Sequence, residues 1–442
     1  MAFTYINRKV DQELDSWSKE RNRKPLLLRG ARQVGKSSSV RHLARNFEHF
    51  LEVNFEADKE ARDIFAKGSL SPQRLCSELA AIYQIPIIPG KTLLFLDEIQ
   101  SSVPAISSLR FFYEQYRELH VIAAGSLLEF AFQELQSFGV GRVRSMFMHP
   151  MSFFEFLDGC GYSLLQGAIK SANSQNPLSL PVHQKAIELL RVFLVIGGMP
   201  EVVSAYATSN DILACQRILD DLVISLRSDF AKYKEKVPAL QIAAVFDSVA
   251  NQIGKKFILS NASNDYNHRQ LKAALELLKM AGLVIPVTHT AANGVPLGAE
   301  MDIKKQKMLL LDTGILQRLL GLSLTELLLS DDFSQINKGS IAELFIGLEI
   351  LKSSSPYEQK NLFYWHRENK SSNAEVDFVA QIGQHIIPIE VKGNTKGGMQ
   401  SLRLFLAEKK SIYGIRTSME NFSELPDVKI VPLYALGNFI SP

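Results

Sequence analysis

The stretch Leu26-Leu27-Leu28-Arg29-Gly30-Ala31-Arg32-Gln33-Val34-Gly35-Lys36-Ser37 has the spacing of a phosphate-binding loop. The two glycines let backbone N–H groups curl around phosphates, the lysine reaches the β and γ oxygens, and the serine ligates magnesium. The apolar run before the loop predicts a buried strand, and Val40, Leu43 and Phe47 follow it at helical spacing. A glycine-rich turn is the alternative, but this context favours a nucleoside triphosphate site. The expected nucleotide-binding residues are Gly30, Ala31, Arg32, Gln33, Val34, Gly35, Lys36, Ser37, Ser38 and Asp97.

Two adjacent acids, Asp97 and Glu98, end a second apolar run over residues 92–96. Parallel α/β sheets place their ligands at the carboxyl ends of strands. We expect Asp97 to hold magnesium through water, and Glu98 to activate the water that attacks the γ-phosphate. Alone, the pair equally fits a strand that ends in solvated charges. Combined with the loop, it predicts triphosphate hydrolysis.

A third expected strand, over residues 119–124, ends at Gly125 and Ser126. Its hydroxyl would lie between the phosphate-binding loop and the acids, so Ser126 is the candidate polar sensor of the γ-phosphate. The same serine can cap the helix expected over residues 127–136, and the two roles can coexist.

Five short segments match the pattern of a known protein family. They are Gly30 to Ser37, Glu52-Val53-Asn54-Phe55-Glu56, Leu96-Asp97-Glu98-Ile99-Gln100, Gly125-Ser126-Leu127-Leu128 and Pro150-Met151-Ser152-Phe153-Phe154-Glu155-Phe156. Together they resemble the prokaryotic AAA-type ATPases of the AAA+ superfamily, similar to AAA_14, that carry a C-terminal DUF4143 region. The resemblance covers nearly the whole chain. It implies ATP as the nucleotide, Mg²⁺ as its cofactor and assembly into a homo-oligomer.

The resemblance also suggests an arginine for the site. In that family Gly141-Arg142 precedes the Pro-x-Ser-Phe-x-Glu-Phe box, which makes Arg142 the first candidate for an arginine finger or for a phosphate contact within the same subunit. Arg144 is the second candidate. A solvated basic pair on a surface loop is the alternative reading.

The middle of the chain has a winged-helix-like pattern. Gly197-Gly198-Met199-Pro200 matches the lid element of the resembled family, and helical patterns follow over residues 240–253 and 268–281, with a strand over 283–287. The polar residues left for the outer face of the second helix are Arg269, Gln270, Lys272 and Lys279. Such a module can present this helix to DNA, or it can pack between neighbouring domains without touching DNA.

The C-terminal part shows an α-β-β-β-α-β order that is similar to the PD-(D/E)xK nuclease core. Glu343 lies on the expected first helix, Asp377 on the second strand, and Glu390 and Lys392 on one face of the third. We expect Glu343, Asp377 and Glu390 to hold Mg²⁺ or Mn²⁺, with Lys392 activating the attacking water. A retained core that only binds DNA, without chemistry, is the alternative.

The run Lys304-Lys305-Gln306-Lys307 precedes a strand expected from residue 308. We expect these lysines to protect a strand edge by their charge, and a contact with a phosphate backbone is the alternative.

The composition bounds these expectations. The 442 residues are 46% apolar with a net charge of +3, so the chain can bury two or three cores, and its mild charge does not by itself indicate nucleic acid. We expect an α/β protein with a P-loop ATPase core at 1–165, a helical lid and winged-helix-like domain at 182–290, and a nuclease-like α/β domain at 300–442. The sequence shows neither an apolar membrane span nor a signal core at its start, and its three cysteines lack metal spacing, so a cytoplasmic protein is expected.

These expectations give two hypotheses for function. In the first, ATP binding and hydrolysis move or clamp DNA, which the C-terminal core grips or cuts. In the second, ATP sets the conformation of a switch or interaction scaffold, and the nuclease-like core is catalytically inactive.

Overall fold

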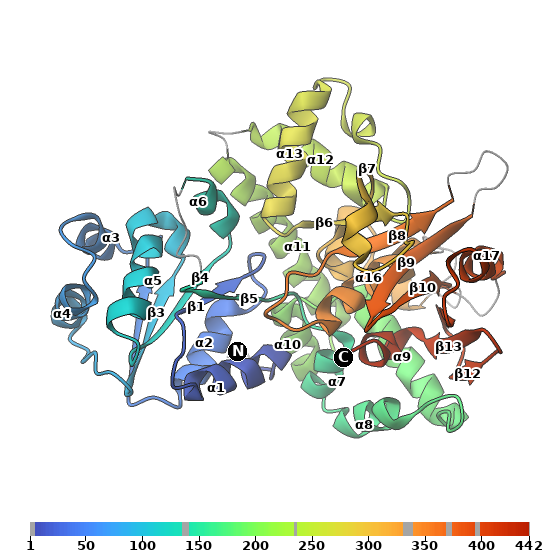
Figure 1. Ribbon diagram of the computed structural model, residues 1–442, viewed down its shortest axis with the longest axis horizontal. Helices are drawn as coiled ribbons and strands as arrows, with labels where there is room; N and C mark the ends of the chain where they lie inside the picture. Colours follow the sequence, from blue (N-terminus) through green and yellow to red (C-terminus); the bar gives the residue numbers. More distant parts are fainter. Residues whose placement is uncertain are drawn as a thin grey trace.

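The computed structural model describes residues 5–134, 141–233, 237–329, 339–367, 374–393 and 398–441. Figure 1 shows one sheet near each end of the long axis, with most of the middle helices between them. The chain begins beside the first sheet and ends beside the second.

The first sheet has five parallel strands in the order β2-β3-β4-β1-β5. They are β1 Leu26–Arg29, β2 His49–Asn54, β3 Thr92–Asp97, β4 His120–Gly125 and β5 Arg144–Phe147. Every residue of β3 and β4 is buried, as expected for strands that helices cover on both faces. The helices of this part are α1 Lys9–Lys19, α2 Lys36–Ala44, α3 Lys59–Ala66, α4 Pro72–Tyr83, α5 Val103–Gln115 and α6 Leu128–Glu134. This is the fold of a P-loop NTPase core, as the sequence predicts.

Helices make up the middle of the molecule. They are α7 Phe153–Gly159, α8 Ser163–Ser171, α9 Leu180–Ile196, α10 Pro200–Ser209, α11 Ile212–Asp229, α12 Ala239–Asn251 and α13 His268–Met280. The helices α12 and α13 pack on each other, and the strands β6 and β7 follow them in the chain. The winged-helix-like unit expected here stays a prediction.

The second sheet has eight strands in the order β12-β13-β11-β10-β9-β8-β6-β7. They are β6 Val284–Thr290, β7 Met301–Leu310, β8 Leu362–His366, β9 Glu375–Ile382, β10 His385–Val391, β11 Gly414–Ser418, β12 Ser423–Glu424 and β13 Val428–Pro432. Its helices are α14 Thr313–Leu319, α15 Leu324–Leu329, α16 Ser340–Ser353, α17 Gln400–Lys409 and α18 Leu436–Phe439. The expected α-β-β-β-α-β order is present as α16, β8, β9, β10, α17 and β11.

The boundary expected between residues 290 and 300 falls inside an antiparallel hairpin. Strand β6 pairs with β7 on one side and runs parallel to β8 on the other. The strands that would form the wing therefore continue the C-terminal sheet. Composition did not reveal this continuity because pairing between distant strands leaves no local signal in the chain.

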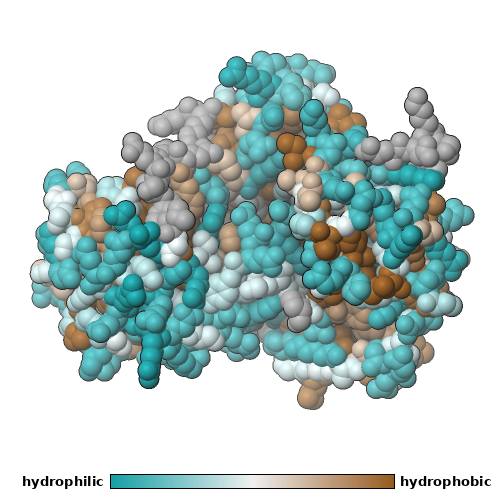
Figure 2. All heavy atoms as spheres, viewed as in Figure 1, coloured by the Kyte–Doolittle hydropathy of each residue, from teal (hydrophilic) through white to brown (hydrophobic). Residues whose placement is uncertain are grey.

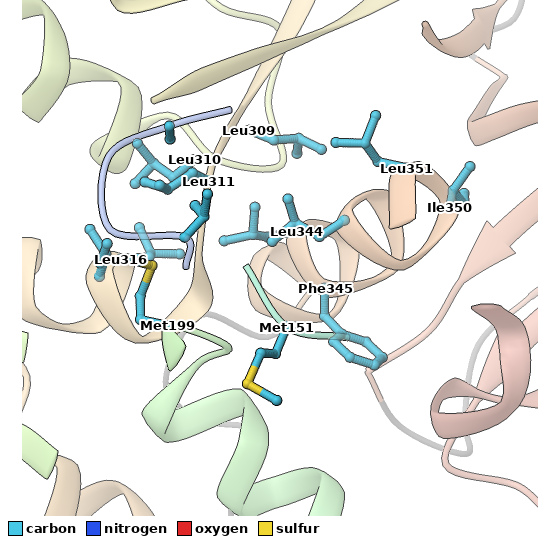
Figure 3. Close-up of a cluster of buried hydrophobic side chains, with 14 of the residues drawn as sticks. Met151, Met199, Leu309, Leu310, Leu311, Leu316, Leu344, Phe345, Ile350 and Leu351 are labelled. Carbon is cyan, nitrogen blue, oxygen red and sulfur yellow. The ribbon is translucent and has the colours of Figure 1, made fainter. Parts of the chain in front are cut away.

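One apolar cluster joins the two ends of the molecule (Figure 3). Met151 and Met199 come from the segments that follow the first sheet, and they lie beside Leu311, Leu344 and Phe345 from the C-terminal part. All five side chains are buried. The part of the chain that holds the first sheet and the C-terminal part therefore share one hydrophobic core. Apolar burial of this kind is the main stabilising term of a fold.

The surface in Figure 2 is largely hydrophilic over the first sheet, and apolar atoms gather over the C-terminal sheet. Within the described ranges, no helix combines the length and apolar character needed to cross a membrane.

Candidate functional site

The phosphate-binding loop connects β1 to α2 and has a backbone that only glycine permits at two positions. Gly30 has φ 147°, and a Cβ atom there would lie 2.2 Å from the carbonyl oxygen of Met148. Gly35 has φ 97° and begins α2 as its N-cap. Positive φ and close backbone approach both exclude larger residues, so the loop geometry follows directly from the two glycines.

Lys36 lies folded against the loop itself. Its Nζ atom donates to the carbonyl oxygens of Gly30 at 2.9 Å and Ala31 at 2.8 Å. Burial lowers the pKa of Lys36 to about 8, although the nearby charges of Glu98 and Asp97 oppose this shift. Burial disfavours the charged form of Lys36 in the free protein, and the negative charge of a bound triphosphate would stabilise that form.

The structure brings Ser37 and Asp97 together, as expected of a magnesium site. The Ser37 hydroxyl donates to Asp97 Oδ2 at 2.8 Å. Asp97 is buried at the carboxyl end of β3, and this burial raises its pKa, while the Ser37 hydrogen bond opposes the rise. The hydroxyl and carboxylate oxygens are the hard ligands that Mg²⁺ prefers, so this pair fits the cation.

Glu98 follows Asp97 in a left-handed conformation, with φ 49°. Its Oε2 atom accepts a hydrogen bond of 2.6 Å from the side-chain amide of Gln100. A non-glycine residue with positive φ is uncommon and is held there by its surroundings. Gln100 thus sets the orientation of the carboxylate that would activate water.

A cavity of about 650 Å³ lies over the loop, large enough for a nucleotide. Of the expected residues, those that line it are Arg32, Gln33, Gly35, Lys36, Ser37, Ser38 and Glu98. Its other walls come from the N-terminal segment, including Tyr5, Ile6 and Arg8, and from Pro200, Glu201 and Ser204 of α10. Tyr5 stacks on His42 of α2, with ring centroids 4.3 Å apart.

Three expected residues lie at other places around the loop. Gly30 and Ala31 line a second cavity of about 350 Å³, on the side of the loop towards α13 and β6, and Ser126 lines the same cavity. Ser126 is buried at the end of β4. The sensor role of Ser126 therefore stays a prediction, and part of the helix expected to follow it, residues 135 and 136, lies outside the described residues.

Arg142 lies far from the loop of its own subunit. Strand β5 is parallel to β1, with Leu26 paired to Arg144 and Arg29 to Phe147, so Arg142 is at the amino end of the strands and the loop is at their carboxyl end. Arg142 forms an ion pair with Glu114, and Arg144 forms one with Glu20. The expected phosphate contact within one subunit is thus wrong, because parallel pairing separates the two ends. A finger role towards a neighbouring subunit stays a prediction.

The acidic residues of the C-terminal core gather around a lysine that the sequence did not single out for this place. Lys307 of β7 is 1% exposed, and its Nζ lies 2.8 Å from Glu343 Oε1 and 2.6 Å from Glu375 Oε1. Asp377 Oδ1 is 3.9 Å away. Burial raises the pKa of Glu343 to about 7 although the charge of Lys307 opposes the rise. We expected Lys307 to protect a strand edge by its charge. This prediction is wrong for Lys307, because residues 307–310 of β7 are buried.

The remaining members of the expected nuclease site are occupied by contacts of their own. Asp377 Oδ2 accepts from the backbone N–H of Val391 at 2.8 Å, and Lys392 donates to Glu390 Oε1 at 2.5 Å. Burial raises the pKa of Glu390 to about 6. In the described part of the chain, no three histidine, cysteine or acidic side chains are arranged to hold a metal ion. The expected metal set Glu343, Asp377 and Glu390 therefore stays a prediction, and in this structure the Lys307 ammonium lies beside Glu343.

Sequence reasoning missed Arg8, Gln100 and Lys307. Gln100 was visible as the last residue of the Leu-Asp-Glu-Ile-Gln segment, where its spacing from Glu98 could have suggested a contact. Arg8 and Lys307 act across large sequence separations, to Glu155 and to Glu343. Only the folded chain reveals such pairs.

Comparisons with known proteins identify an AAA domain in the first part of the chain. A family model described as an AAA domain, AAA_14, matches residues 22–157. Two domains of unknown function also match: DUF8612 over residues 187–326 and DUF4143 over residues 338–436. A search of curated proteins found no match.

Among solved structures, the chain is similar to the Aeropyrum pernix ORC1 protein in complex with DNA, at 12% identity, with a TM-score of 0.29 over 72% of this chain and 93% of that one. It is also similar to C. elegans PCH-2, at 15% identity, with a TM-score of 0.24 over 61% and 68% of the two chains. Drosophila ORC bound to DNA matches at 14% identity, with a TM-score of 0.23 over 72% and 88%. The chain therefore contains an AAA domain over residues 22–157 and a DUF4143 region over residues 338–436, the combination that the sequence resemblance predicts.

Proposed function

We propose that this protein hydrolyses ATP and uses the nucleotide to control how it binds or remodels DNA. The observation that carries the ATPase part is the pairing of Ser37 with Asp97 beneath a loop whose lysine is buried. When bound, Mg²⁺ would neutralise charge on the β and γ phosphates, held by these two residues. Lys36 would turn from the loop carbonyls to the phosphates, and Glu98 would orient water.

The ATPase proposal is tested by measuring phosphate release from ATP and from GTP with three proteins. Native protein should release phosphate from ATP only in the presence of Mg²⁺. Lys36→Ala should lose nucleotide binding, whereas Glu98→Gln should bind ATP and lose turnover by roughly a hundredfold or more. Turnover that survives in Glu98→Gln would assign the water to another residue.

The route from nucleotide to DNA is proposed to run through the winged-helix-like unit, which contacts the loop at both of its ends. Before the unit, Asp229 of α11 forms an ion pair with Arg32. After α13, Gly282 has φ 69°, and a Cβ atom there would lie 3.4 Å from the backbone nitrogen of Ala31. A change in the loop on nucleotide binding would therefore shift the unit as a body.

The DNA-facing surface is proposed to be the exposed side of α13, with Arg269 and Lys272. We expect Arg269→Glu with Lys272→Glu to weaken DNA binding and to reduce the slope of log affinity against log salt by about two. The matched control is Lys59→Glu with Lys67→Glu, an equal charge change on exposed residues at α3, far from α13 in Figure 1. If the two double variants weaken DNA binding equally, DNA binding depends on the net charge of the protein and not on a contact at α13.

The C-terminal core is proposed to serve in binding rather than in cutting, because Lys307 pairs with the acids that a metal would need. Incubation of labelled linear, single-stranded and branched DNA with Mg²⁺ or Mn²⁺ should give no cleavage, with or without ATP. Cleavage by native protein that disappears in Lys392→Ala would instead establish a nuclease. If none of these DNAs changes the rate of ATP turnover or the conformation of the protein, the result would favour the nucleotide-controlled switch or scaffold.

A further inference from the structure

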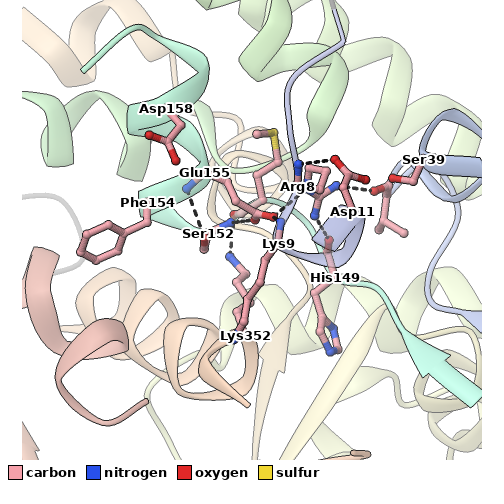
Figure 4. Close-up of polar contacts among 12 residues, drawn as sticks. Arg8, Lys9, Asp11, Ser39, His149, Ser152, Phe154, Glu155, Asp158 and Lys352 are labelled. Carbon is pink, nitrogen blue, oxygen red and sulfur yellow. Dashed lines mark hydrogen bonds and ion pairs between the residues drawn. The ribbon is translucent and has the colours of Figure 1, made fainter. Parts of the chain in front are cut away.

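The buried Arg8 joins the N-terminal segment to the phosphate-binding loop (Figure 4). Its guanidinium donates from three nitrogens in three directions. Nη1 reaches the carbonyl oxygen of Val34 at 2.9 Å, Nη2 that of His149 at 2.8 Å, and Nε reaches Glu155 Oε1 at 3.0 Å. Arg8 thus ties the loop to the turn that follows β5.

Glu155 fixes Arg8 in turn. Its carboxylate also accepts from the backbone N–H groups of Lys9 and Ser152, each at 2.7 Å. The charge of Arg8 lowers the pKa of Glu155 although burial opposes the shift, so this carboxylate stays ionised. Glu155 is the acid of the Pro-x-Ser-Phe-x-Glu-Phe box, for which the ATP chemistry gives no other role.

The Val34 carbonyl is the point where this contact affects nucleotide binding. In a planar trans peptide the C=O and the following N–H point in opposite directions, so a fixed Val34 carbonyl fixes the Gly35 N–H. That N–H belongs to the group that cradles phosphates. Glycine tolerates both signs of φ, so the Val34–Gly35 peptide could otherwise turn over at low cost.

We propose that Arg8, held by Glu155, is a positioning residue that prevents the Val34–Gly35 peptide from flipping and so keeps the loop ready for the triphosphate. This inference rests on the proposed ATPase function and names how its site is held in shape. The three donor nitrogens of Arg8 bind protein oxygens, so Arg8 acts on the nucleotide through the loop. Glu155 of the Pro-x-Ser-Phe-x-Glu-Phe box supplies the carboxylate that orients Arg8.

The test compares the affinity for ATP with Mg²⁺, measured by titration calorimetry, in four variants of the full chain. Arg8→Ala should weaken binding by roughly tenfold or more, since small misplacements of positioned groups have large effects. Glu155→Gln should weaken binding less, in the same direction, and Arg8→Lys should recover part of the loss because one ammonium can still reach one carbonyl. Lys9→Ala is the matched control, because Lys9 lies in the same N-terminal segment as Arg8. The Lys9 Nζ atom donates to the carbonyl oxygens of Ser353 and Ser354 at the end of α16, and not to the loop.

Thermal unfolding without nucleotide separates positioning from stability. Affinity should differ between Arg8→Ala and Lys9→Ala even when their unfolding midpoints fall equally. Native affinity in Arg8→Ala, or an equal loss in Lys9→Ala, would overturn the proposal. If Arg8→Ala does not fold, Glu155→Gln and Arg8→Lys carry the comparison. Absence of ATP binding in the native protein would refute the ATPase function itself, which is a distinct outcome.

Discussion

At the scale of single residues, the nucleotide site depends on groups whose charge and direction are set by burial. Lys36 and Glu98 show this in opposite ways. Burial lowers the pKa of Lys36, whereas the orientation of the Glu98 carboxylate is set by a hydrogen bond from the neutral amide of Gln100. Each dependence gives an expected outcome.

ATP binding should take up a proton at alkaline pH. Near pH 9 the free protein holds Lys36 mostly neutral, because its pKa is about 8, and the charge of the triphosphate favours the ammonium. Below about pH 7 the lysine is already charged and uptake should vanish. Calorimetric titration in buffers of different ionisation enthalpy measures this uptake. Lys36→Arg, whose guanidinium stays charged, should bind without it, and uptake that persists in Lys36→Arg would point to another group.

The same lowered pKa predicts how stability depends on pH. Between about 8 and the ordinary value of 10.5, the unfolded chain binds more protons at Lys36 than the folded chain does. The Lys36 contribution to the free energy of unfolding therefore rises with pH across this window.

Gln100→Leu should lower turnover by roughly tenfold while leaving the affinity for ATP unchanged, since the amide orients Glu98 and does not line the nucleotide cavity. Phosphate release and calorimetric affinity, measured together, give this split. Ser101→Ala, an exposed neighbour, is the control. Native turnover in Gln100→Leu would mean that Glu98 keeps its direction through its own backbone.

At the scale of elements, the sequence predicted those features that local pattern controls. The loop glycines and the strand of buried residues before Asp97 follow from spacing and hydrophobicity alone. The partners of Lys307 could not be predicted, because β7 and α16 are distant in the chain and each alone looks ordinary. A lysine in a charged run is usually solvated, and the burial of the inner half of β7 overrides that expectation.

Lys307→Met should destabilise the fold by about 3 kcal/mol or more, because it leaves Glu343 and Glu375 without their buried cation. Lys305→Met, which removes a pair with Asp302 at the surface, should have a much smaller effect. Denaturant unfolding measures both. Adding Glu343→Gln to Lys307→Met should recover much of the loss, since the buried charge is then absent.

The pH dependence of Lys307→Met provides an independent check. Burial already raises the pKa of Glu343 to about 7, so the folded state binds a proton there more tightly than the unfolded state does. Without the lysine this pKa should rise further, and the deficit in unfolding free energy should shrink as the pH falls from about 8 to about 5. A deficit that is constant with pH would show that Lys307 acts through packing.

At the scale of the whole molecule, the two ends share one core, and we expect them to unfold together. Met151 and Met199 pack with Leu344 and Phe345 in one cluster, and Gly198 donates its backbone N–H to Asp312 Oδ2 at 2.6 Å. The part with the first sheet and the C-terminal part are thus joined both by apolar packing and by a buried hydrogen bond. Separate domains joined by a linker would show neither, so a nucleotide bound at one end can influence the other through a continuous body.

The chain contains two tryptophans, one in each half, which makes this cooperation measurable. Trp17 is buried in α1 beside the first sheet, and Trp365 is buried in β8 of the second. We expect Trp365→Phe, which leaves Trp17, and Trp17→Phe, which leaves Trp365, to report the same unfolding transition by fluorescence. Saturating ATP with Mg²⁺, at about a hundred times its dissociation constant, stabilises the folded state by about 2.7 kcal/mol. Both reporters should therefore shift upward by roughly 3 °C. A Trp365 transition that ignores ATP would divide the molecule into two independent units, and the proposed coupling of nucleotide to the C-terminal core would then fail.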